Sequence, residues 1–157
     1  MTQEEKQLLL KDLCARLPYG VKVIDKYKSQ TKTLSAVDIE NLVVRFYEND
    51  VDAPFGTHIE NPLKLYLQIK PYLRPMSSMT EEELKELNSK HGSIAYFFIQ
   101  EPPYYHGLQA QHSDIGSIKL SEFSEIYDWL NAHHFDYRGL IEKGLAFEAP
   151  EGMYKQE

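Results

Sequence analysis

The fold is decided by a stretch in the middle of the chain where a strand-like segment gives way to a strongly marked helix start. This stretch reads Ile69-Lys70-Pro71-Tyr72-Leu73-Arg74-Pro75-Met76-Ser77-Ser78-Met79-Thr80-Glu81-Glu82-Glu83. Pro71 and Pro75 each restrict their own φ and the residue before them, so we expect the backbone to leave a sheet here in an extended form. Thr80 and Glu83 have the spacing of a capping box, which predicts a helix over residues 81–89.

The residues before this stretch predict one helix and then a small sheet. Thr2 and Glu5 have capping-box spacing and leucines follow at four-residue steps, which predicts an amphipathic helix over residues 3–16, ended by Pro18 and Gly20. Runs typical of strands follow at residues 21–24, 33–39, 42–47 and 63–69, the last with leucine or isoleucine at every second position. We expect the second and third runs to pair as a hairpin. The sheet should be antiparallel and curled, and an SH3-like arrangement is one candidate.

Helical signals dominate the residues after the central stretch. Ser121 is a good N-cap for a helix, and Asp136 is expected to cap a short last helix over residues 137–143, which Gly144 should end in the left-handed conformation. One face of the first of these helices carries Phe123, Ile126, Tyr127, Leu130 and His134. The aromatic run at residues 93–99 is predicted as a buried strand, with a core helix as the alternative, and residues 100–119 as a long loop.

The sequence therefore predicts a single α+β domain over residues 1–157. Residues 1–75 should form the N-terminal helix and the small sheet, and residues 76–157 the helical C-terminal part.

Two further segments, read with residues 69–83, carry a resemblance to a known family. They are Leu9-Leu10-Lys11-Asp12-Leu13-Cys14-Ala15-Arg16-Leu17-Pro18-Tyr19-Gly20-Val21 and Asp128-Trp129-Leu130-Asn131-Ala132-His133-His134-Phe135-Asp136-Tyr137-Arg138-Gly139-Leu140-Ile141. Together the three segments resemble a family of small uncharacterised proteins from gut bacteria and their prophage-like elements. The resemblance implies an origin in a phage or mobile element, and it implies no activity.

Charge and cysteine content narrow the possible partners and the compartment. The net charge is −7, and residues 76–157 hold six Lys and Arg against fourteen Asp and Glu. An acidic surface repels nucleic acid, so a weak nucleic-acid-binding module using Lys22, Lys26, Lys28 and Lys32 is only a third alternative. The single Cys14 favours a reducing compartment, and we expect a cytoplasmic protein with no membrane segment and no signal peptide.

A set of histidines and aspartates is the strongest candidate for chemistry. His106, His112 and Asp114 lie in the predicted long loop, and His133, His134 and Asp136 lie at the end of the penultimate predicted helix, which follows that loop. Three such groups could hold one metal ion if the loop folded onto the helix end, which would indicate a metal-assisted hydrolase. No HExxH or comparable motif is present. The favoured interpretation is structural, with one histidine packed against Trp129 or Tyr137 and the other near the helix C-terminus.

The other candidates favour binding over catalysis. Tyr104, Tyr105 and His106 follow two prolines in the long loop and supply rigid amphipathic contact area of the kind enriched in protein recognition sites. The favoured alternative for this loop is a lid that packs on the protein's own sheet. Cys14 lies within a predicted helix turn without a nucleophile elbow, so a small core residue is favoured over a nucleophile. We therefore expect a non-enzymatic binding or accessory protein that acts on a protein partner and needs no cofactor.

Overall fold

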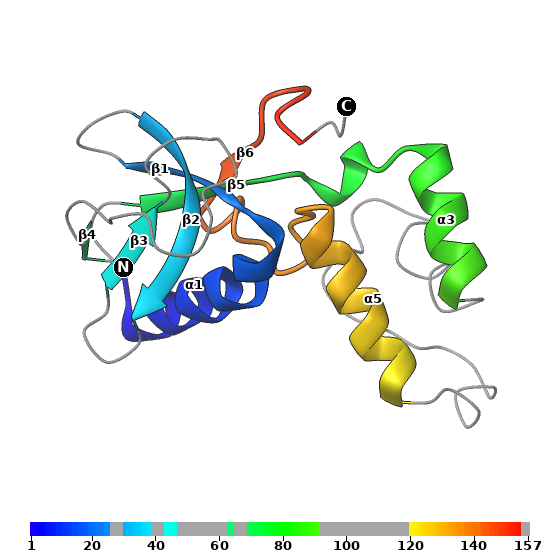
Figure 1. Cartoon of the computed structure of the whole chain (residues 1–157), viewed down its shortest axis with the longest axis horizontal. Helices are drawn as coiled ribbons and strands as arrows, with labels where there is room; N and C mark the ends of the chain where they lie inside the picture. The colour runs from blue at the N-terminus through cyan, green and yellow to red at the C-terminus, as the bar shows by residue number, and fades with distance from the viewer. Residues whose placement is uncertain (26–29, 39–42, 47–62, 65–68, 92–119, 155–157) are drawn as a thin grey trace.

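The computed structural model describes the chain except for residues 26–29, 39–42, 47–62, 65–68, 92–119 and 155–157 (Figure 1). The helices are α1 (Gln3–Arg16), α3 (Glu81–His91) and α5 (Leu120–Ala132), and short 3-10 turns lie at Leu17–Tyr19 and Met76–Ser78. The strands are β1 (Lys22–Asp25), β2 (Gln30–Asp38), β3 (Val43–Phe46), β4 (Leu63–Lys64), β5 (Ile69–Leu73) and β6 (Phe147–Glu148). The α+β fold class predicted from the sequence is confirmed.

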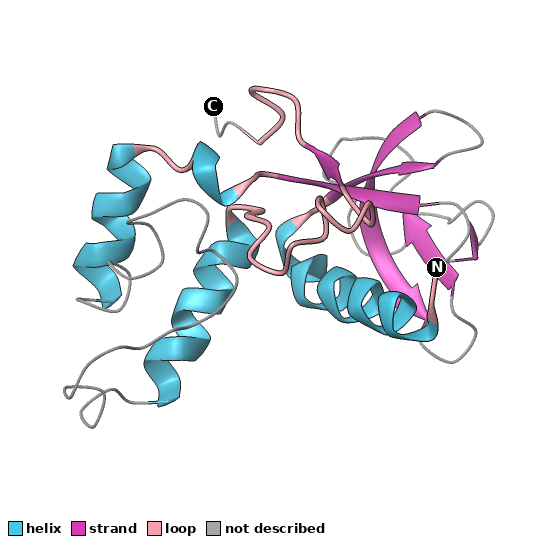
Figure 2. Cartoon of the chain, turned by 180° about the vertical axis from the view of Figure 1, so that it is seen from behind, coloured by secondary structure: helices cyan, strands magenta, loops and turns pink. Residues whose placement is uncertain are grey.

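Helix α1 forms as the sequence predicts, with the expected bounds. The Glu5 amide donates to Thr2 Oγ1 at 3.1 Å and the Thr2 amide donates to Glu5 Oε2 at 2.6 Å, which completes the capping box. After the 3-10 turn, Gly20 has φ 66°, so the left-handed conformation ends the helical segment. Figures 1 and 2 show α1 lying across one face of the sheet, where Leu9 and Leu13 are fully buried.

The sheet has the strand order β4-β3-β2-β1-β5-β6. The predicted hairpin between β2 and β3 is confirmed, since the two strands pair in antiparallel fashion. The prediction of an all-antiparallel sheet is wrong at one edge, because β5 and β6 pair in parallel. This pair joins segments more than seventy residues apart in the sequence. Strand β6 has only two residues, too few to show the alternation of polar and apolar residues from which strands are predicted.

The strand order requires the sheet to curl, as predicted. Strands β4 and β5 are separated in the order by β3, β2 and β1, which in a flat sheet would put them about 19 Å apart. Only five Cα steps lead from Lys64 to Ile69, and an extended chain of that length spans at most about 17 Å. The two ends of this part of the sheet must therefore bend toward each other. An SH3-like arrangement stays a prediction.

Strand β5 corrects the expectation that Pro71 leads the chain out of the sheet. Pro71 lies inside β5 opposite Val23, and burial alternates so that Ile69, Pro71 and Leu73 face the core. The Ala149 amide donates to the Leu73 carbonyl at 2.8 Å on the β6 side of the strand. Backbone groups of residues two apart in a strand point to the same side, so the Pro71 nitrogen also points toward the β6 side. The pairing with β6 starts only at Tyr72, so no described strand lies opposite this nitrogen. The proline therefore costs the sheet no ladder hydrogen bond.

The second helical start forms as the sequence predicts. The Glu83 amide donates to Thr80 Oγ1 at 3.2 Å, and the Thr80 amide donates to Glu83 Oε2 at 2.9 Å. Helix α3 then runs to His91, two residues beyond the predicted end. Ser121, predicted as an N-cap, lies inside α5, so that prediction is wrong. The segments at residues 93–99 and 100–119 lie outside the described residues.

The predicted helix over residues 137–143 is wrong, and turns take its place. Gly139 has φ 68°, a left-handed conformation that interrupts a helix after its first two residues. Asp136 still acts as a cap, because its two carboxylate oxygens accept the amides of Leu140 and Ile141 at 2.8 Å each. Gly144, at φ 66°, is left-handed as predicted.

Two separate hydrophobic clusters stabilise the described structure. The first, which we call the sheet core, joins α1, β1 to β3, β5 and the 140–146 turn. It comprises Leu9, Leu13, Val21, Val23, Leu34, Val44, Phe46, Ile69, Leu73, Leu140, Leu145 and Ala146. The second, the helix core, joins α3 and α5, which lie on the opposite side of the molecule from the sheet in Figure 2. It comprises Met76, Leu87, Ile126, Trp129, Leu130 and Phe135.

The predicted core of the 63–69 run can be checked only in part. Ile69 faces the sheet core together with Val21, Val23 and Phe46, as predicted, and Val44 of β3 is buried there too, whereas the burial of the predicted Val43 is not described. Leu65 and Leu67 lie outside the described residues. Across the described ranges, no helix combines the length and the apolar character needed to cross a bilayer.

Candidate functional site

Polar side chains meet where the sheet core and the helix core adjoin. We call Asp12, Arg16, Tyr137 and Arg138 the junction cluster. Asp12 and Arg16 are fully buried on α1, and Arg16 Nε donates to Asp12 Oδ2 at 2.8 Å. Arg138 Nη1 donates to the other carboxylate oxygen of Asp12 at 3.1 Å. Both guanidinium groups also lie over the Tyr137 ring, at 5.5 Å for Arg16 and 4.8 Å for Arg138.

The junction cluster was not predicted from the sequence, although the sequence pattern of α1 indicates that two of its members, Asp12 and Arg16, are buried. Asp12 and Arg16 share the helical face of Leu9 and Leu13, because positions 9, 12, 13 and 16 recur at three- and four-residue steps. Charged residues on an apolar face are buried only when they are paired. The distant partners, Arg138 and the Phe135 carbonyl, have no local sequence signal.

His134 lies beside the junction cluster, just after α5. It was predicted on the apolar face of a continuing helix, and this is wrong because the helix ends at Ala132 and His134 has φ 59°. Its ring instead stacks on Tyr154 with centroids 3.8 Å apart. Burial, with added repulsion from Arg16, His133, Arg74 and Lys22, lowers the pKa of His134 to about 3, so the imidazole is neutral near pH 7.

Tyr154 fastens the C-terminal segment to the sheet. The Lys22 amide donates to its hydroxyl at 3.0 Å, and the hydroxyl donates to the Tyr72 carbonyl at 2.8 Å. These two residues would form the next rung of the β1–β5 ladder, which stops at Val23 and Pro71. The tyrosine hydroxyl therefore replaces a strand-to-strand hydrogen bond where the strands separate. Burial raises the pKa of Tyr154, which keeps the hydroxyl protonated and able to donate.

Arg74 makes a second polar connection between the sheet and the helices. Its Nη1 and Nη2 donate to the two carboxylate oxygens of Glu83 at 2.6 and 2.9 Å, and its guanidinium lies 4.2 Å from the centre of the Phe135 ring. The Arg74 backbone bonds both His134 and Asp136, which continues β5 toward the helical part. Partial burial acts to raise the pKa of Glu83, but the bonds from Arg74 and the Thr80 amide hold it below its usual value.

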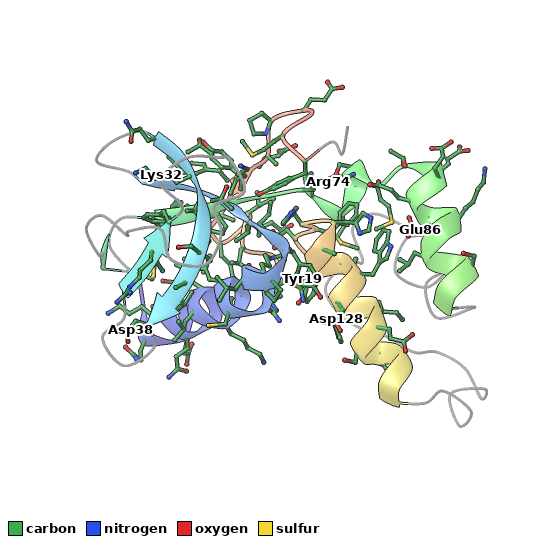
Figure 3. All side chains as sticks on the ribbon, in the orientation of Figure 1. Tyr19, Lys32, Asp38, Arg74, Glu86 and Asp128 are labelled. Atoms are coloured by element: carbon green, nitrogen blue, oxygen red, sulfur yellow. The ribbon has the colours of Figure 1, made fainter. Side chains whose placement is uncertain are left out.

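A further contact between helices lies near Arg74. Trp129 Nε1 donates to Glu86 Oε1 at 3.1 Å, which links α5 to α3. Figure 3 shows Arg74 and Glu86 on the side of the molecule where α3 lies.

Tyr19 and Asp128 lie where the end of α1 faces α5, as Figure 3 shows. Burial raises the pKa of Tyr19, and the negative charge of Asp128 raises it further.

The structure separates the described members of the predicted metal set. His133 stacks on Trp129 at 3.8 Å, and its Nδ1 lies 2.9 Å from the Trp129 carbonyl oxygen, as the structural interpretation predicts. His134 stacks on Tyr154, and Asp136 caps the 140–141 turn. Within the described ranges, no three His, Cys, Asp or Glu side chains are grouped so that they could hold a metal. His106, His112 and Asp114 lie outside those ranges.

The described members of the predicted basic patch do not share a surface. Lys22 pairs with Thr33 and Val23 with Lys32, so the register puts Lys22 and Lys32 on opposite faces of the sheet. Lys22 Nζ donates to Thr33 Oγ1 at 2.8 Å, consistent with the outer face. Lys26 and Lys28 lie outside the described residues, as do Tyr104, Tyr105 and His106 of the predicted binding loop.

Cys14 is partly buried on α1, and burial raises the pKa of its thiol. A raised pKa reduces the thiolate fraction at neutral pH, which is the opposite of what an activated nucleophile needs. The position therefore agrees with the interpretation of Cys14 as a small packing residue.

An aromatic surface lies on the outer face of β5 and β6, and the sequence analysis missed it. We call Lys70, Tyr72 and Phe147 the aromatic strip. The Tyr72 and Phe147 rings have centroids 6.0 Å apart, and Lys70 Nζ lies 4.8 Å from the centre of the Phe147 ring. Phe147 is 41% exposed, and Met1 is the other large apolar residue exposed in the described part of the chain. The strip depends on the parallel β5–β6 pair, so no local pattern could reveal it.

Comparisons with known proteins do not identify this chain. No family model, no curated protein and no solved structure matches it.

Proposed function

We propose that this protein is a non-enzymatic binding or accessory protein that presents the aromatic strip to a protein partner. The observation that supports the proposal is Phe147, which stays 41% exposed while neighbouring side chains fix its position. Aromatic side chains on rigid elements contribute most of the binding energy in many protein interfaces. A role in a phage or mobile element, and a cytoplasmic location, rest on the family resemblance and on the single cysteine.

The geometry of the strip suits recognition for two reasons. Tyr72 and Phe147 occupy paired positions on adjacent strands, so little side-chain freedom would be lost on binding. The strip also lies at the β6 edge of the sheet, where a partner could contact side chains and backbone together. The side chains of the junction cluster, in contrast, are bound to one another inside the protein.

The test is affinity capture of partners from the native host with three forms of the protein. Phe147→Ser removes the exposed ring, and Lys85→Ala alters an exposed residue of α3, on the other side of the molecule, as the matched control. A partner that uses the strip should bind Phe147→Ser at least about tenfold more weakly, the effect expected of a central aromatic contact. The control should bind like the wild type.

Both variants should first be shown to keep the wild-type melting temperature within a few degrees, since each changes an exposed side chain. Equal recovery of the same partners by wild type and Phe147→Ser would remove the strip as the binding surface. Turnover of a substrate by the purified protein would overturn the non-enzymatic part of the proposal.

A further inference from the structure

Two buried polar atoms beside the junction cluster have no partner in the described structure, Arg16 Nη1 and His134 Nδ1. Buried polar atoms in folded proteins nearly always have a hydrogen-bond partner, and an unmade bond of this kind costs about 1–3 kcal/mol. We propose that a small inorganic anion of the size of chloride binds between these two nitrogens. This inference is independent of the proposed function.

The two nitrogens belong to the same small region. Arg16 Nη2 donates to the carbonyl oxygen of Phe135 at 2.7 Å, and His134 is the residue before Phe135. The other two nitrogens of the Arg16 guanidinium are already used, by Asp12 and by this carbonyl. The remaining Nη1 carries two N–H donors and no acceptor among the described residues.

His134 can supply a further donor. Its ring position is fixed by the stack on Tyr154, and it is only 5% exposed. A neutral imidazole can carry its proton on either nitrogen, and no acceptor in the described part of the chain competes for the Nδ1 proton. Placed on Nδ1, the proton would point a second donor at a ligand that already accepts from Arg16.

The local charge favours an anion over a neutral ligand. Asp12 contributes one negative charge, whereas Arg16 and Arg138, which both bind it, contribute two positive charges. After burial, the strongest influence that lowers the pKa of His134 is the charge of Arg16, and Arg74 and Lys22 act in the same direction. Among them, Arg74 is neutralised by Glu83. The junction cluster therefore carries one positive charge in excess of Asp12, on the partly exposed Arg138, and this excess favours an anion in its neighbourhood over a neutral ligand.

Burial limits the size of the ligand. Arg16 is fully buried and His134 is only 5% exposed, so a ligand that binds between them must itself be enclosed by the protein and therefore small. A monatomic anion needs only a few donors and one small cavity. The site should therefore accept chloride and bromide and exclude bulky organic anions such as gluconate.

The test compares thermal unfolding in sodium chloride and in sodium gluconate at equal ionic strength. Chloride at about ten times its dissociation constant should raise the melting temperature by about 3–6 °C, because a ligand that binds only the folded state stabilises it by mass action. Crystals grown with bromide should show an anomalous peak within hydrogen-bond reach of Arg16 Nη1 and His134 Nδ1.

His134→Phe is the matched variant, since it keeps an aromatic ring to stack on Tyr154 and removes the Nδ1 donor. It should lose both the chloride-dependent rise and the bromide peak. Equal melting temperatures of the wild type in the two salts, or an ordered water without anomalous signal at the site, would overturn the proposal. If the variant fails to fold, the bromide peak in wild-type crystals decides alone.

Discussion

Removing the charge of Asp12 should be one of the most damaging single changes to the stability of this protein. The carboxylate is fully buried and accepts from two arginines, at 2.8 Å from Arg16 and 3.1 Å from Arg138. Asp12→Asn keeps the size of the side chain but leaves the buried Arg16 charge without its counterion. Breaking a buried ion pair by removing one partner costs about 3–5 kcal/mol, and we expect a loss in that range.

Two companion variants show whether the effect comes from unpaired charge. Arg138→Met leaves the buried Asp12 Oδ1 without a partner but keeps Asp12 paired with Arg16, so it should cost about 1–3 kcal/mol, less than Asp12→Asn. The double variant Asp12→Leu with Arg16→Met removes both buried charges and fills the space with apolar atoms. Such replacements are often nearly neutral, so the double variant should be more stable than Asp12→Asn alone.

Urea unfolding followed by circular dichroism measures these differences, provided that the denaturant slope is unchanged. A loss below about 1 kcal/mol for Asp12→Asn would contradict the reasoning, because it would mean that Arg16 finds another counterion or reaches water. A double variant that is less stable than Asp12→Asn would contradict it in a second way, since its stability would then depend on the ion pair itself.

Four further predictions concern other parts of the molecule. Thr80→Ala should destabilise the protein by about 0.5–2 kcal/mol in urea unfolding and leave partner capture unchanged, because Thr80 caps α3 away from the aromatic strip. Tyr154→Phe should cost about 1–3 kcal/mol by the same assay, since it leaves the Lys22 amide and the Tyr72 carbonyl without their shared partner. The pKa of His134 is lower in the folded state than the ordinary 6.5, so its neutral form contributes stability above pH 6.5 that is lost as the pH falls toward about 3. In chloride-free buffer, wild type should therefore lose more stability than His134→Phe between pH 7 and pH 4, and equal losses would refute this. Added zinc should not raise the melting temperature, as expected if the histidines are structural or exposed, and a saturable rise would favour the metal hydrolase instead.

The parts of the fold that were predicted correctly depend on contacts between near neighbours in the sequence. Both capping boxes join residues three positions apart, so the helix starts at Thr2 and Thr80 could be located without knowledge of the tertiary structure. The strand runs were found because alternation and β-branched residues mark a half-buried strand locally. The antiparallel hairpin between β2 and β3 follows from their short separation.

The errors occur where distant segments decide the local structure. Pro71 stays in the sheet because no described strand is paired on the side to which its nitrogen points. The local sequence cannot predict which side of a strand will be paired. Residues 137–143 carry helix-forming side chains, but Asp136 binds two amides of the following turn and Gly139 reverses its φ. The parallel addition of β6 and the aromatic strip depend on the same return of the chain to β5.

The contacts that join the two halves of this protein differ in kind from those within each half. The sheet core and the helix core are apolar clusters, whereas the connections between them are directional: Arg16 to the Phe135 carbonyl, Arg74 to Glu83, and Arg138 to Asp12. Apolar surfaces can slide with little loss of free energy, but charge-assisted hydrogen bonds weaken steeply when their geometry changes. The arginines therefore fix the orientation of the helices relative to the sheet. Because they lie fully or mostly out of solvent, this orientation should be less sensitive to salt than one set by surface charges.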